Sequence, residues 1–144
     1  MRLYTFIKSH LDEILNEWDK FAETLFPKEM PRYLLRDHAR EMLTELMADM
    51  KTTQSPQAQF EESKEVASPF HPSDSAASVH GIMRQNEGFS VPELAAEFRS
   101  LRAVILRMWL PKIDDLSEEV VADVVKFNEA IDDALTESIA VCIC

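Results

Sequence analysis

Histidines are the residues of this chain most able to bind a metal or take part in catalysis. There are four of them: His10, His38, His71 and His80. No two stand at the H-x-x-x-H spacing that puts two imidazoles on one helical face, so we predict no metal site. His10 and His38 border apolar stripes, where packing is the simpler interpretation, and His71 falls in a predicted loop. His80 opens a polar cluster with Arg84, and a single histidine of this kind could be a haem ligand or a phosphoacceptor.

A larger set of residues flanks the apolar stripes of the predicted helices, where polar side chains are half-buried and must find partners. The set consists of His80, Arg84, Glu97, Arg99, Arg102, Trp109, Asn128 and Asp132. Two interpretations are open: a structural network of salt bridges between helices, or a bistable switch or ligand pocket. In either case we expect at least one ion pair between helices among the charged members of the set.

No arrangement in the sequence predicts catalysis. Nucleophilic catalysis needs a nucleophile, a base and an orienting group, and no local pattern supplies them. The adjacent carboxylates Asp132 and Asp133 would point about 100° apart on a helix, so they would not face one substrate. The chain has only two glycines, Gly81 and Gly88, so phosphate-binding loops are absent and the turns of a sheet protein are scarce. We therefore predict an all-α fold without catalytic residues.

The helix that positions most of this set is predicted over residues 90–111. Ser90 and Glu93 form the S-x-x-E pattern of a capping box, in which each side chain satisfies a free backbone N–H. Apolar residues then follow at steps of three and four, which predicts one buried face. These residues are Leu94, Phe98, Leu101, Ile105 and Met108. We expect this helix to be the central element of the fold.

The other helices are predicted by the same periodicity. One long helix is expected over 3–25, ended by Pro27, and a second from Pro31 to Met50. The periodicity fails over 51–75, which predicts a long mobile loop with a short helix at 58–66. A short helix follows over 76–86, and the last helix begins near Ser117. Together they predict a single domain, residues 1–144, folded as a bundle of five or six helices.

Charge and composition bound the partners and the cellular location. The formal net charge of −11 argues against a nucleic-acid or anionic-membrane partner. The positive residues of 90–112 precede a strongly acidic segment, 113–140, so two neighbouring helices of opposite charge are expected. No apolar run is long enough to span a bilayer, and Cys142 and Cys144 stand alone, which favours a reduced, cytoplasmic protein.

The spaced residues of the second half resemble a known family. The pattern begins with His80-Gly81-x-x-Arg84-x-x-x-Gly88-Phe89-Ser90. It continues with Leu94-x-x-Glu97-Phe98-Arg99-x-Leu101-Arg102, Ile105 and Trp109, and then with Phe127-Asn128-Glu129-Ala130-Ile131-Asp132. Over about residues 79–140 it is similar to the RsbRD-type N-terminal sensor domain, in the branch attached to histidine kinases. The resemblance implies a globin-like helical bundle without an established haem, acting as an input module, so no cofactor is expected.

The predicted function is therefore a cytoplasmic signal-sensing input domain of a bacterial sensor histidine kinase, working in a two-component system. The apolar pattern of the last helix still runs at Cys144, so kinase domains are expected downstream and a homodimer is expected. A phosphoacceptor motif of the H-E-x-R-T-P type does not occur in the chain. The alternatives are a histidine phosphotransfer bundle, although His80 lacks the H-x-x-K-G pattern, and a haem or small-ligand module.

Overall fold

The computed structural model describes residues 1–25, 32–51 and 75–140. Within these ranges it contains α-helices, one 3-10 turn and no strand. The helices are α1 (Leu3–Ser9), α2 (Leu11–Leu25), α3 (Arg32–Lys51), α5 (Ala76–Asn86), α6 (Val91–Trp109) and α7 (Glu118–Ala140), and the turn η1 is Leu110–Lys112. The predicted all-α bundle of five or six helices is confirmed, with six α-helices in the described residues. The loop and short helix predicted within 52–74 lie outside the described residues.

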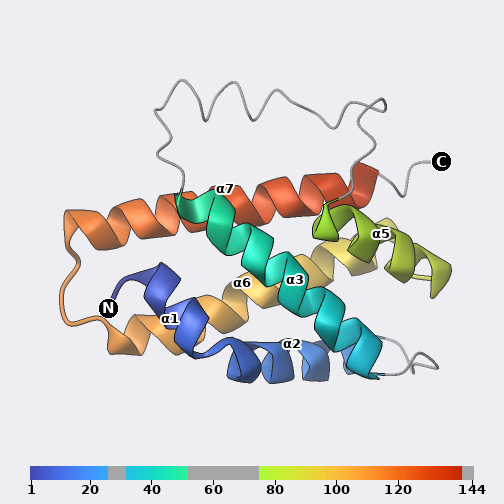
Figure 1. Ribbon diagram of the computed structural model, residues 1–144, viewed down its shortest axis with the longest axis horizontal. Coiled ribbons are helices and arrows are strands. Elements are labelled where there is room, and N and C mark those ends of the chain that lie inside the picture. The colour runs from blue at the N-terminus through green and yellow to red at the C-terminus, as the bar shows by residue number, and fades with distance from the viewer. Residues whose placement is uncertain (26–31, 52–74, 141–144) are drawn as a thin grey trace.

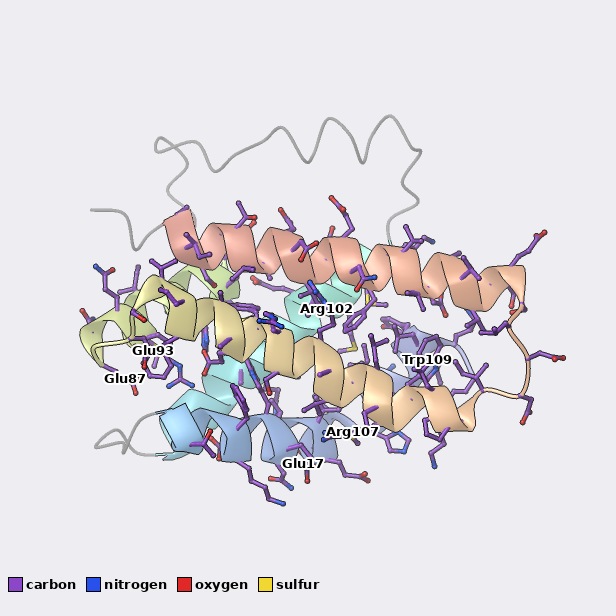
Figure 2. All side chains as sticks on the ribbon, turned by 180° about the vertical axis from the view of Figure 1, so that it is seen from behind. Glu17, Glu87, Glu93, Arg102, Arg107 and Trp109 are labelled. Carbon is purple, nitrogen blue, oxygen red and sulfur yellow. The ribbon has the colours of Figure 1, made fainter. Side chains whose placement is uncertain are left out.

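The helices α6 and α7 are joined by η1 and a short connection (Figure 1). The helix α3 crosses them obliquely, from α7 at one end to α2 at the other. Seen from behind, α6 lies between α2 and α7, and α5 packs at the end of α7 that is far from η1 (Figure 2). Apolar side chains from all six helices form one core, so the described residues are a single packed unit.

The central helix α6 forms as its sequence predicts. The Ser90 side chain accepts a hydrogen bond from the Glu93 N–H, and the Glu93 carboxylate accepts one from the Ser90 N–H, which completes the capping box. Four of the five residues predicted on its apolar face, Leu94, Phe98, Leu101 and Ile105, are at most 1 % exposed, whereas Met108 is half-buried. None of the described helices is long and apolar enough to cross a bilayer.

The single helix predicted over 3–25 is wrong, because the chain breaks at His10 into α1 and α2. The backbone N–H of His10 is shared between the carbonyls of Phe6 and Ile7, at 3.0 and 3.3 Å. The Ser9 hydroxyl donates to the Thr5 carbonyl at 2.8 Å, so side chains help to satisfy the end of α1. Only His10 lies between α1 and α2, so the apolar residues of the two helices stay almost in phase. Periodicity alone therefore does not reveal the break.

Candidate functional site

The site is built where α5 meets the first half of α6. His80 and Arg84 stand one helical turn apart on α5, so both side chains leave the same face of that helix. Glu97 lies on the buried face of α6, between Leu94 and Leu101. These three residues, which we call the buried charge cluster, are 3 %, 4 % and 0 % exposed, respectively.

The Glu97 carboxylate joins the three side chains of the buried charge cluster. Its Oε1 atom lies 2.5 Å from His80 Nε2 and accepts a hydrogen bond from Arg84 Nε at 3.1 Å. Its Oε2 atom lies 2.6 Å from Arg84 Nη2. One carboxylate therefore contacts both basic groups, and the ion pair expected between helices is confirmed.

The electrostatics of the cluster keep Glu97 ionised. Burial by itself raises the pKa of a carboxyl group, but the opposing effects of His80 and Arg84 lower the pKa of Glu97 to about 2. Arg84 Nη1 also donates to the Glu87 carboxylate, at 3.1 and 3.3 Å to its two oxygens. Two carboxylates, Glu97 and Glu87, therefore face Arg84, and Glu97 also contacts His80.

Aromatic side chains close the cluster off from solvent. The Trp18 ring stacks on His80, with 5.5 Å between centroids, and Phe98 meets the imidazole edge-on at 5.7 Å. The Trp18 indole N–H donates to the Glu97 carbonyl at 2.8 Å, which ties α2 to α6 at the cluster. The Arg84 guanidinium lies 4.8 Å above the centre of the Phe89 ring. The cluster therefore has fixed neighbours on α2, α5 and α6.

The other candidate residues do not join the buried charge cluster. Arg102 on α6 pairs with Asp132 on α7 at 2.5 Å, as an ion pair at the surface. Trp109 is fully buried at the far end of α6, where its indole N–H donates to the Met1 carbonyl at 3.0 Å. Arg99 is exposed on α6 and Asn128 is half-buried on α7. Neither side chain takes part in the contacts of Glu97 with His80 and Arg84.

The opposite charges of α6 and α7 meet at the Arg102–Asp132 pair, but α6 also turns a positive side chain the other way. Figure 2 shows Arg107 on the side of α6 that faces Glu17 of α2. The distance between Arg107 Nη2 and Glu17 Oε2 is 3.9 Å. The basic residues of α6 thus connect it to both neighbouring helices. The attraction between the opposite charges of α6 and α7 is therefore only part of the ion pairing of α6.

A separate cavity of about 220 Å³ lies between α3, α5 and α7. Its lining includes the carboxylates of Glu45, Asp49, Asp133 and Glu137, beside small and apolar side chains. None of the eight candidate residues lines this cavity. Across the described ranges, no group of three His, Cys, Asp or Glu residues is placed to hold a metal ion.

Sequence reasoning missed two partners of the buried charge cluster. The apolar periodicity of 3–25 predicts only that Trp18 is buried, because its hydrogen bond to Glu97 depends on which helix packs against α2. Glu87 stands three residues after Arg84, and this spacing on a helix is a signal from which the contact could have been inferred. No family model, curated protein or solved structure matches the chain.

Proposed function

We propose that this chain is a regulatory input domain, and that the buried charge cluster is the part of it whose state changes with the signal. The complete burial of Glu97, His80 and Arg84 is the observation that carries the proposal. Groups enclosed on all sides have no access to a substrate. Their role is therefore to set the conformation of the helices that hold them.

Physical chemistry favours a role in conformation over one in stability. Removing charges from water costs several kcal/mol per ion, by order of magnitude, and a buried ion pair often returns no more than an apolar replacement would. Such a cluster does confer a unique arrangement on α2, α5 and α6, because any displacement separates charges in a medium of low dielectric constant. An arrangement of this kind has two well-separated states, intact and broken, as a switch requires.

The geometry of His80 works against both alternative functions. A phosphoacceptor histidine must present a free ring nitrogen to an incoming phosphoryl group, and a haem ligand must present one to iron. The Nε2 atom of His80 lies 2.5 Å from the Glu97 carboxylate, and the residue is 3 % exposed. A phosphotransfer or haem-binding role would require the cluster to open first.

The resemblance of residues 79–140 to RsbRD-type sensor domains directs the proposal to a bacterial sensor histidine kinase of the cytoplasm. In such a protein α7 would carry the signal onward, because its apolar face extends from Val120 to Ile139. Two copies could then pair along the continuing helix as a homodimer. The kinase activity would belong to the parent protein, and this chain would supply its regulation.

The proposal is tested by changing the phase of α7 in the parent protein. Two residues inserted after Ile139 rotate everything downstream by about 200°, whereas seven residues restore the face to within about 20°. We expect the two-residue insertion to abolish the response of autophosphorylation to the stimulus and the seven-residue insertion to retain much of it. A normal response with both insertions, or a parent protein without kinase domains, would contradict the proposal.

A further inference from the structure

The helix α5 holds the buried charge cluster on one face and contacts α7 with another. His80 and Arg84 point to α6, while Ala77 and Gly81, also one turn apart, lie against α7. A movement of α5 that separates His80 from Glu97 must therefore also move the surface in contact with α7. This arrangement couples the buried charge cluster to α7, which contributes no residue to the Glu97 contacts with His80 and Arg84.

The contact between α5 and α7 is too close to absorb such a movement. A Cβ atom at Gly81 would lie 2.2 Å from the Ser138 carbonyl oxygen and 2.9 Å from its carbonyl carbon, so only glycine fits there. The Ser138 hydroxyl donates to the Ala77 carbonyl at 2.5 Å. At the N-cap of α5, the Ser75 hydroxyl donates to Glu137 Oε2 at 2.6 Å. Because the two backbones are in direct contact here, we expect the two helices to move together at this point.

The first half of α7 is held by a different set of contacts. The carboxylate of Asp123 accepts hydrogen bonds from Arg2 Nε and Nη2, at 2.9 and 2.6 Å, and from the Leu3 N–H at 3.0 Å. Asp123 is 5 % exposed. At about 1.5 Å per residue, this attachment lies about 22 Å along the helix from Ser138. The two ends of α7 thus have independent attachments.

We propose that α5 is a relay that couples the state of the buried charge cluster to the C-terminal half of α7, while the Asp123 attachment keeps the first half fixed. Breaking the cluster releases α5, which carries Ser138 and its neighbours with it. The end of α7 then moves about the fixed Asp123 attachment. The value of this relay for signalling rests on the proposed function, but the coupling itself is a property of the chain that can be measured without any kinase.

Amide hydrogen exchange of the whole chain under native conditions tests the relay. His80→Gln keeps a hydrogen-bond donor near Glu97 but removes the ionisable ring, and Glu97→Gln removes the central charge. In both variants we expect exchange over 134–140 to rise roughly ten-fold or more, with 120–127 close to wild type. Asp123→Asn should give the reverse pattern, with faster exchange over 120–127.

A general loss of stability is controlled by Gly88→Ala. Gly88 has φ +92° and open space around its missing Cβ, so alanine there strains the backbone without touching α7. Relative to wild type, Gly88→Ala should change the exchange rates of the two halves of α7 by about the same factor. If His80→Gln and Glu97→Gln accelerate exchange in α5 and α6 but leave 134–140 at the wild-type rate, or accelerate both halves of α7 equally, the relay is wrong.

Gly81→Ala tests the contact itself. Because the new methyl group must push α5 away from Ser138, we expect faster exchange over 134–140 even with the cluster intact. Adding His80→Gln should then cause little further change in that segment, since the connection is already broken. Additive acceleration in the double variant would overturn the relay. A kinase output that ignores these variants would count against the proposed function and leave the measured coupling standing.

Discussion

Glu97→Gln is the substitution that most directly measures the buried charge cluster. The change keeps the size of the side chain but replaces one carboxylate oxygen with an NH₂ group. Both oxygens of Glu97 contact donors, which are His80 Nε2 and two nitrogens of Arg84. The NH₂ group of the new amide must therefore face an N–H donor instead of an acceptor. The guanidinium also loses its central partner while staying buried. No rotation of the amide satisfies all three contacts.

The expected cost follows from the burial of both partners. Breaking a buried ion pair by removing one member typically costs about 3–5 kcal/mol. Arg84 keeps its contact with Glu87, which places the expected loss toward the lower end of that range. Domains of this size have a free energy of unfolding of about 5–15 kcal/mol, so the variant should still fold.

The assay is urea unfolding followed by circular dichroism, with Asp132→Asn as the matched control. Asp132 also pairs with an arginine across two helices, but its side chain is 60 % exposed, and exposed pairs are worth about 0.2–1 kcal/mol. The slope of the unfolding free energy against urea should stay unchanged in both variants. If Glu97→Gln costs no more than Asp132→Asn, the cluster does not hold the helices together and the reasoning is refuted.

Three further predictions concern stability. The pKa of Glu97 is lowered from 4.5 to about 2 and that of Asp123 is lowered as well, by its bonds to Arg2 and Leu3, which outweigh burial. The unfolded chain then binds more protons than the folded one, so the stabilisation is complete above about pH 4.5 and is lost as the pH falls toward 2. Thermal melts across that range should show the fall, and Glu97→Gln should reduce it. Leu101→Ala removes a fully buried side chain of α6 and should cost about 2–5 kcal/mol in urea unfolding, with no such loss for the exposed Ala103→Ser. Ser90→Ala should cost about 1 kcal/mol by loss of the capping box, and Ser90→Asp should restore most of it.

The parts of the fold that the sequence predicts are those governed by local chemistry. The bounds of α5 and the capped start of α6 follow from the capping residue and the apolar period within each helix. The break at His10 is not predictable in this way, because Ser9 and His10 satisfy the end of α1 without a proline or glycine. A single residue outside the helix leaves the apolar stripe almost in phase.

The candidate site shows the same division between local and distant information. Polar residues beside apolar stripes predict that Arg84 and Glu97 need partners, and the two helices that carry them are adjacent in the chain. The Trp18 contact joins residues far apart in the sequence, so it depends on which face of α2 packs on α6. The close approach at Gly81 likewise depends on α7, although a glycine inside a predicted helix is itself unfavourable and hints at a packing reason.

The positions of the two tryptophans give the protein a pair of built-in fluorescent probes. Trp18 and Trp109 are the only tryptophans of the chain, and both are buried. The first stacks on His80 and bonds to α6 at Glu97, while the second lies about 18 Å further along that helix, against Met1. Single-tryptophan variants, made by Trp18→Phe or Trp109→Phe, would therefore report on the two ends of the bundle separately. An event confined to the buried charge cluster would change the emission of one probe and leave the other silent.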